Sequence, residues 1–124
     1  MPLYWTIDSK KRLFTGVGEG EVTFHAAISL LEAQAGAKAL SYRKLFDGRA
    51  VQSTMTGEEV LAVCARIRAY HEHASVGPLA MVGTREQTVT FARLLGALAT
   101  ADRPMKMFTG LRQARSWLDQ QQPT

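Results

Sequence analysis

The stretch from Leu45 to Glu59 constrains the fold of this chain more than any other. It begins with apolar residues typical of a buried strand, passes through a polar connection and reaches Thr56-Gly57-Glu58-Glu59. A threonine followed three residues later by glutamate forms a capping box, in which each side chain accepts a hydrogen bond from the other residue's backbone amide. The stretch therefore predicts a strand over 40–47, a polar connection, and a helix from Thr56 to about Ala74.

The same succession of strand and helix is repeated along the chain. Thr23 precedes an apolar pattern with helical spacing that stops at Gly36, and Thr84 with Gln87 forms a second capping box. Short apolar runs of the kind that forms covered strands lie at 79–83 and 105–108. The expected helices therefore cover 24–35, a segment from Thr84 that carries Val89 and Leu98 inward and ends before Asp102, and 111 to about 120 with Ala114, Trp117 and Leu118 buried.

An antiparallel hairpin is expected at the start of the chain. Leu3, Trp5 and Ile7 alternate with polar or exposed positions, a turn-prone segment follows, and alternation resumes over 13–17. Gly16, Gly18 and Gly20 then form a run that superficially matches a phosphate-binding loop. Because these glycines follow a hairpin strand and the fingerprint spacing is incomplete, they predict a bulge or loop.

These elements predict an α/β fold in the order ββαβαβαβα, with a mixed sheet of about five strands and helices packed on it. Three strand-helix-strand crossovers create parallel pairs, and the hairpin adds an antiparallel one. The length of 124 residues suits a single domain that spans 1–124.

The net charge of +4 does not by itself indicate nucleic-acid binding. The basic residues are scattered and are not interleaved with aromatic residues as a base-stacking platform requires. Cys64 is the single cysteine and cannot form an internal disulfide, and the sequence shows neither a secretory segment nor an apolar run long enough to span a membrane. We therefore expect a cytoplasmic protein without a transmembrane segment and without a nucleic-acid partner.

A binding edge is expected where the parallel strands end and the next helices begin. Three segments should meet there, and each contributes hydroxyl or backbone amide groups. Arginine in a first helical turn is mildly unfavourable, so an anion or an acidic partner could compensate for it. The candidate residues for contact with a ligand or a protein partner are Asp47, Arg49, Thr56, Thr84, Arg85, Thr109 and Arg112.

Neither a catalytic group nor a metal site can be assembled from residue spacing. His25 and Asp47 would serve an enzyme only if the fold brought both into one cleft. His71-Glu72-His73 resembles a metal cluster, but residues two apart point to different faces of a helix. Cys64 lies on the apolar side of its helix, where a thiol is usually an inert packing group. We therefore expect no catalytic residue, metal or cofactor.

The arrangement resembles the SpoIIAA-like proteins, a bacterial group related to STAS domains and compared with CRAL-TRIO lipid-binding domains. The resemblance covers about Tyr4 to Leu118, and its signature segments are the hairpin, Phe46-Asp47, Ala80-Met81-Val82-Gly83, Met107-Phe108 and the closing Ala114-Arg115-Ser116-Trp117-Leu118. It implies an α/β fold with a mixed sheet, no established catalysis for most members, and protein interaction or binding of a hydrophobic or anionic ligand.

The resemblance also bears on Thr56. Antagonists of anti-sigma factors carry a phosphorylatable serine at the start of a helix, and Thr56 falls at that position when counted from Asp47. However, Met55 stands where the motif has aspartate, and two glutamates follow, so a helix cap is favoured over a regulatory phosphosite. Two functional hypotheses remain: a non-enzymatic regulatory or interaction domain, and a domain that binds a small amphipathic, lipid-like or anionic ligand. A homodimer formed through the hairpin or an exposed helix face is also possible.

Overall fold

Five strands form one sheet in which the spatial order follows the chain order, β1-β2-β3-β4-β5. The computed structural model describes residues 3–53, 55–87 and 104–121. β1 pairs antiparallel with β2, whereas the β2–β3, β3–β4 and β4–β5 pairs are parallel, which confirms the predicted mixed sheet. The strands are β1 Leu3–Asp8, β2 Leu13–Val22, β3 Arg43–Ser53, β4 Leu79–Val82 and β5 Met105–Phe108.

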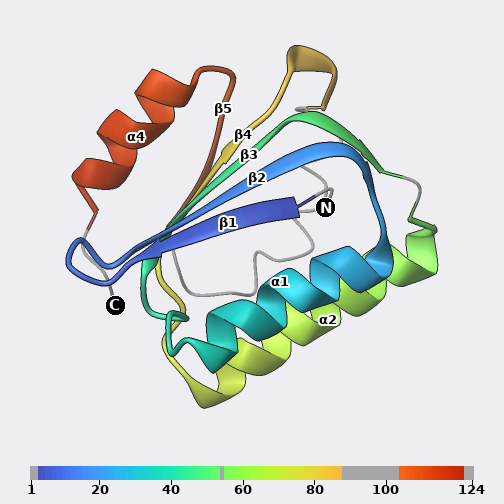
Figure 1. Ribbon diagram of the computed structural model, residues 1–124, viewed down its shortest axis with the longest axis horizontal. Helices are drawn as coiled ribbons and strands as arrows, with labels where there is room; N and C mark the ends of the chain where they lie inside the picture. Colours follow the sequence, from blue (N-terminus) through green and yellow to red (C-terminus); the bar gives the residue numbers. More distant parts are fainter. Residues whose placement is uncertain (1–2, 54, 88–103, 122–124) are drawn as a thin grey trace.

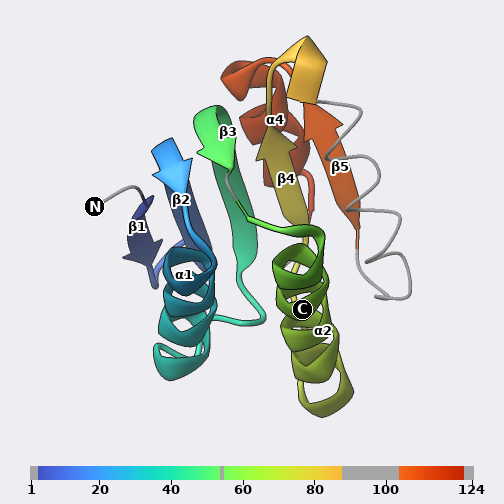
Figure 2. The ribbon, with the colours of Figure 1, turned by 90° about the vertical axis from the view of Figure 1, so that its right-hand side faces the viewer.

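Helices cover both faces of the sheet. α1 (Phe24–Gly36) and α2 (Gly57–His73) lie side by side on one face, and α4 (Leu111–Asp119) lies on the other (Figures 1 and 2). The crossovers from β2 to β3 and from β3 to β4 step to the next strand in the same direction, so α1 and α2 return over the same face. α4 follows β5, the last strand within the described residues, and folds over the opposite face (Figure 1).

Each face has its own hydrophobic core. Under α1 and α2 the buried residues are Leu3, Phe14, Val22, Leu30 and Leu31. Under α4 they are Leu45, Ala80, Val82, Ala114 and Leu118. Trp117 packs at the margin of this second core, with its ring 5.8 Å from that of Phe108. The predicted inward side of the last helix is thereby confirmed.

The glycine run lies within β2, so the expectation that it follows the strand is wrong. The alternative of a bulge is confirmed, because the β2–β3 register shifts between Val17 and Glu19. A Cβ atom added to Gly18 would lie 2.3 Å from Cγ2 of Val51, and one added to Gly16 would lie 3.1 Å from the ring of Phe46. The glycines therefore let two side chains of β3 lie across β2.

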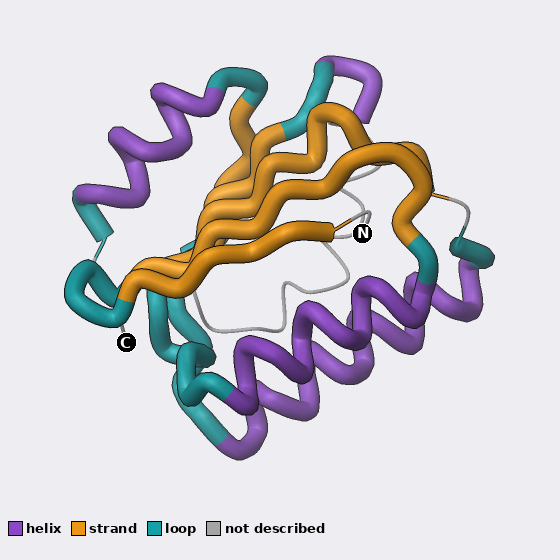
Figure 3. Tube along the Cα trace, in the orientation of Figure 1, coloured by secondary structure: helices purple, strands orange, loops and turns teal. Residues whose placement is uncertain are grey.

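The predicted boundaries of the central strand are also wrong, since β3 runs from Arg43 to Ser53 and not from 40 to 47. Gly18 stands opposite two residues, Gly48 and Arg49, and regular pairing then resumes at Ala50. The polar residues that had indicated a connection lie in this bulge. β2 is long enough to pair with β3 beyond the bulge, up to Ser53. β2 and β3 therefore extend beyond the shorter strands and curve toward α1 and α2 (Figure 3).

Two basic residues at the start of β3 donate side-chain hydrogen bonds to backbone carbonyls outside the strand. The Lys44 side chain is buried, and its Nζ donates hydrogen bonds to the carbonyl oxygens of Leu40 and Tyr42. The Arg43 guanidinium donates to the Lys11 carbonyl at 2.8 Å and to the Leu118 carbonyl at 3.2 Å. Arg43 thus joins the hairpin turn to the end of α4.

The helix predicted from Thr84 is described only at its start. Residues 85–87 are helical, and the expected inward positions Val89 and Leu98 lie outside the described residues.

Candidate functional site

The carboxyl ends of the parallel strands bring most of the predicted edge residues together. Asp47 pairs with Val82 of β4, and Val82 pairs with Phe108 of β5. The Gly83 amide then donates to the Phe108 carbonyl at 2.9 Å, which keeps the chain segments after β4 and β5 adjacent. Thr84 and Thr109 therefore follow neighbouring strands at the same end of the sheet, and Asp47 lies at this end too.

Thr56 is separated from this edge by the extension of β3. The strand continues six residues beyond Asp47, which corresponds to roughly 20 Å of extended chain. Thr56 caps α2 after that extension. The predicted edge is therefore divided into a group around Asp47, Thr84 and Thr109 and a separate helix start at Thr56.

Asp47 and Arg49 form a bidentate ion pair across the β3 bulge. Arg49 Nε lies 3.0 Å from Asp47 Oδ1, and Arg49 Nη2 lies 2.8 Å from Asp47 Oδ2. The Arg49 backbone amide also donates to Oδ1 at 3.2 Å. These hydrogen bonds lower the pKa of Asp47 below its usual value and outweigh the opposing effect of partial burial, whereas the pKa of Arg49 is raised by the same partner. The carboxylate is therefore held ionised and bonded to Arg49 within the bulge of β3.

Both predicted capping boxes are present. The Thr56 hydroxyl accepts a hydrogen bond from the Glu59 amide at 3.1 Å, and the Glu59 carboxylate accepts one from the Thr56 amide at 3.0 Å. Thr84 and Gln87 exchange the equivalent bonds at 3.3 and 2.7 Å. The two hydroxyls thus take part in starting helices, which is the role that the sequence favoured for Thr56.

Gln87 has a second role that the sequence did not indicate. Its Nε2 donates to the Gly48 carbonyl at 2.9 Å and to the Val51 carbonyl at 3.2 Å. These carbonyls belong to the part of β3 that contains or adjoins the bulge, where the regular pairing with β2 is interrupted. The Gln87 side chain therefore fixes the helix start after β4 against the bulge. The capping pattern located Gln87, but its long-range partners depend on a bulge that was not predicted.

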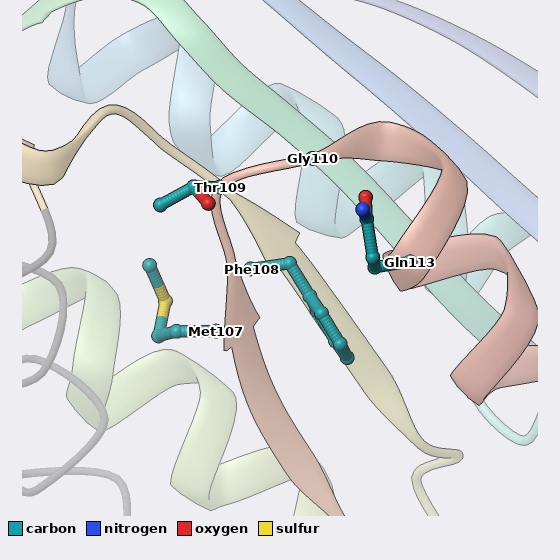
Figure 4. A pocket seen from close by; sticks show the side chains of 5 residues that line it. All are labelled: Met107, Phe108, Thr109, Gly110 and Gln113. Atoms are coloured by element: carbon teal, nitrogen blue, oxygen red, sulfur yellow. The ribbon is translucent and has the colours of Figure 1, made fainter.

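A surface hollow lies where β5 turns into α4. Its volume is about 320 Å³, and Met107, Phe108, Thr109, Gly110 and Gln113 line it. Met107 and Thr109 project to one side of the strand end, whereas Phe108 and Gln113 lie on the other side (Figure 4). Gly110 is the N-cap of α4 and makes no side-chain capping hydrogen bond. The hollow combines the apolar side chains of Met107 and Phe108 with the exposed polar side chains of Thr109 and Gln113. Arg112 is exposed one helical residue before Gln113 and is not part of the lining.

Asp47 and His25 do not share a cleft. Asp47 lies on the same face of β3 as Leu45, which packs under α4. His25 lies in the exposed first turn of α1, on the opposite face of the sheet. The geometry that an enzyme using this pair would require is therefore not formed.

Cys64 is buried, and burial raises the pKa of its thiol while the nearby Arg68 opposes that rise. The helical backbone of α2 continues through His71 and His73. Within residues 3–53, 55–87 and 104–121, no three His, Cys, Asp or Glu residues are grouped to hold a metal ion. The same ranges contain no helix that is long and apolar enough to cross a membrane.

Comparison with known proteins identifies the fold. No family model matches the chain, and no curated protein matches it. Among solved structures, the chain is similar to an uncharacterised protein of the DUF3478 family with a SpoIIAA-like fold, from Shewanella loihica PV-4. The TM-score is 0.67 at 14% sequence identity, and the match covers 94% of this chain and 93% of the other. The likeness extends over nearly the whole of both chains, and the protein has a SpoIIAA-like fold.

Proposed function

We propose that this protein is a non-enzymatic regulatory or interaction domain that recognises an acidic surface of a protein partner. The observation that carries the proposal is the presence of two exposed arginines near a carboxylate that is already held in an ion pair. Arg85 and Arg112 are exposed in the first turns of helices that follow neighbouring strands. Asp47, meanwhile, is paired with Arg49. Such an edge suits attraction of carboxylates better than a chemical step.

The energetics of the helix starts support an acidic partner. A cation near a helix N-terminus faces the positive end of the helix dipole, at a cost of a few tenths to about 1 kcal/mol at exposed sites. A carboxylate from a partner would interact favourably with both the arginine and the helix start. The excess of basic residues, with a net charge of +4, favours the same class of partner. A cytoplasmic setting is part of this proposal.

The test is charge reversal at the two arginines. Arg85→Glu and Arg112→Glu should preserve or slightly raise thermal stability, because glutamate is favoured in a first helical turn. Each should nevertheless reduce capture of an acidic protein from native lysate, as followed by quantitative cross-linking and mass spectrometry. Lys38→Glu is the matched control, since Lys38 is exposed after the end of α1, away from the strand carboxyl ends. Equal capture by all four proteins would contradict the proposal.

A second candidate function is binding of a small amphipathic or anionic ligand at the hollow between β5 and α4. The favouring observation is its lining, in which Met107 and Phe108 stand beside the Thr109 hydroxyl and the Gln113 amide. An apolar wall with a few polar groups is the usual composition of a ligand site.

Native mass spectrometry after gentle purification tests this second function. A retained acyl or anionic adduct would support it, and Thr109→Trp should remove the adduct because the indole would occupy the mouth of the hollow. Gln52→Trp is the control, since Gln52 is an exposed residue of β3 and does not line the hollow. A mass without adduct, together with no thermal stabilisation by fatty acids or inorganic phosphate, would exclude this function.

A further inference from the structure

β1 forms an edge of the sheet, at the opposite side from β5. Within the described part of the chain it pairs only with β2, so alternate backbone amides and carbonyls of Leu3–Asp8 face away from the sheet. Proteins usually protect such an edge with a charged residue, a proline or a bulge. Leu3–Ile7 contains none of these, and its sequence Leu-Tyr-Trp-Thr-Ile favours strand structure. The edge is thus suited to accept another strand.

We propose that the occupant of this edge is β1 of a second copy, paired antiparallel about a two-fold axis that passes midway between Trp5 and the partner's Trp5. The inference concerns the edge remote from the strand carboxyl ends of β4 and β5 and does not depend on the proposed function. In this register Trp5 faces the partner's Trp5, Leu3 faces the partner's Ile7, and Tyr4 faces the partner's Thr6. Residues directly opposite each other point to the same face of a sheet. Apolar residues therefore meet on the face that carries α1.

The exposure of β1 side chains is consistent with this pairing. Ile7 is 39% exposed although it belongs to the same face as the buried Leu3, and Tyr4 is 49% exposed on the other face. The partner's strand would cover part of both side chains. It would also give hydrogen-bond partners to the outward backbone groups and join two five-stranded sheets into one.

The charges at the ends of the strand are complementary in the same register. β2 continues past the start of β1 as Glu19–Val22, and Glu19 is exposed there with Glu21 two residues further along. The partner's hairpin turn would lie beyond Leu3, beside this extension. That turn carries the exposed Lys10 and Lys11 and is fixed by hydrogen bonds from both of their amides to Asp8 Oδ1, each 3.0 Å long. Two symmetric contacts between basic turns and acidic strand ends result.

The first test places like charges at the interface. Tyr4→Lys combined with Thr6→Lys should convert a dimer into a monomer in sedimentation-equilibrium and light-scattering measurements, because in this register each lysine faces a lysine of the partner. Ala65→Lys combined with Ala69→Lys is the matched control, since it adds the same two charges at exposed positions of α2 and leaves β1 and the acidic extension of β2 unchanged. It should leave the dimer intact.

Mixing with an oppositely charged variant distinguishes loss of the dimer contact from loss of the fold, because an unfolded variant would not form a dimer with either partner. A copy with Tyr4→Glu and Thr6→Glu should also be monomeric alone, yet it should form a 1:1 dimer with the lysine variant. A wild-type chain that stays monomeric up to millimolar concentration overturns the proposal. So does a dimer that persists in both charged variants.

Cysteine cross-linking tests the register. In an antiparallel pair, the Cα atoms of opposite residues are about 4.5–5.5 Å apart, which is within disulfide range. Tyr4→Cys mixed with Thr6→Cys should therefore cross-link to the heterodimer at least about tenfold more than either variant alone. Cys64 is buried and serves as the internal control in the wild-type chain. Equal cross-linking of the mixed and separate variants would overturn the register.

The charge contacts predict a smaller effect. Lys10→Glu with Lys11→Glu should raise the dimer dissociation constant about tenfold at low salt, because exposed ion pairs are individually weak. Glu19→Lys with Glu21→Lys in the same chain should restore the affinity. An outside strand-donating protein is an alternative occupant. A 1:1 complex with such a protein, formed by a wild-type chain that shows no self-association, would replace the proposal.

Discussion

The two faces of the sheet are built differently. One face is covered by two long helices whose place follows from the crossovers between parallel strands, and its core draws on β1 and β2 as well as on both helices. The other face is covered by α4, a nine-residue helix that contacts β3, β4 and β5. Over β1 the second face is open enough for Tyr4 to be exposed. Topology therefore secures the first face, whereas the second depends on one helix at the end of the described chain.

Core truncation on each face should give the largest effects. Phe14→Ala should lower the free energy of unfolding by about 3–5 kcal/mol, because the ring is 2% exposed and leaves a cavity below α1. Leu118→Ala should cost about 2–5 kcal/mol on the other face. Urea unfolding followed by circular dichroism measures both. If Leu118→Ala costs less than about 1 kcal/mol, α4 is not an integral part of the second core.

Substitution of Gly18 tests the crossing of β2 by side chains of β3. Gly18→Val should cost about 1–3 kcal/mol, because even a Cβ atom there would lie 2.3 Å from Val51 Cγ2. Gly57→Ala is the control, since a Cβ at that helix start meets nothing within 4 Å. Thermal unfolding distinguishes the two. Equal melting temperatures for Gly18→Val and the wild type would show that the bulge relaxes without strain.

The two helix caps should give intermediate effects. Thr56→Ala and Thr84→Ala should each cost about 1 kcal/mol, because each removes the acceptor for a backbone amide in the first turn. Thr56→Ser and Thr84→Ser retain the hydroxyl and should recover most of the loss in chemical denaturation. A serine variant as unstable as the alanine variant would indicate that the methyl group matters more than the hydrogen bond.

The ion pair on the α4 side should give the smallest effect. The pKa of Asp47 is lower in the folded protein than its usual value of 3.8, chiefly because of hydrogen bonding from Arg49. Its contribution to stability is therefore fully present above about pH 4 and is lost as the pH falls through the folded pKa. Asp47→Asn should cost no more than about 1 kcal/mol at pH 7, because the pair is partly exposed. The difference from wild type should shrink toward pH 2 in acid unfolding; a constant difference would contradict an electrostatic origin.

Local patterns sufficed for the element order, the parallel pairs and both capping boxes. These features depend on short-range chemistry, such as the hydroxyl of Thr56 and the glutamate three residues later. The alternation of strand and helix restricts the possible topologies and gave the α/β class with a mixed sheet. The SpoIIAA-like fold itself was accessible only through the resemblance of several segments to that family.

The boundary of β3 could not be read from local patterns. Gly48 and Arg49 have the composition of a turn, and the strand continues through them because the long β2 offers backbone partners on the far side. The same bulge determines the partners of Gln87, so that part of the candidate site was equally inaccessible. Sequence placed Thr56 beside Asp47 for the same reason, and the strand extension separates them.

Arg43 has a consequence for how the native protein opens. Its guanidinium links the hairpin turn, β3 and the end of α4, and Leu118 is 75 residues away from it in the sequence. If α4 left the sheet, one of these hydrogen bonds would be lost and the adjoining turn would be loosened. We therefore expect α4 and the hairpin turn to exchange their amide hydrogens as a single cooperative unit, and Arg43→Lys to separate their exchange rates. The first and last described elements would then share one local unfolding equilibrium.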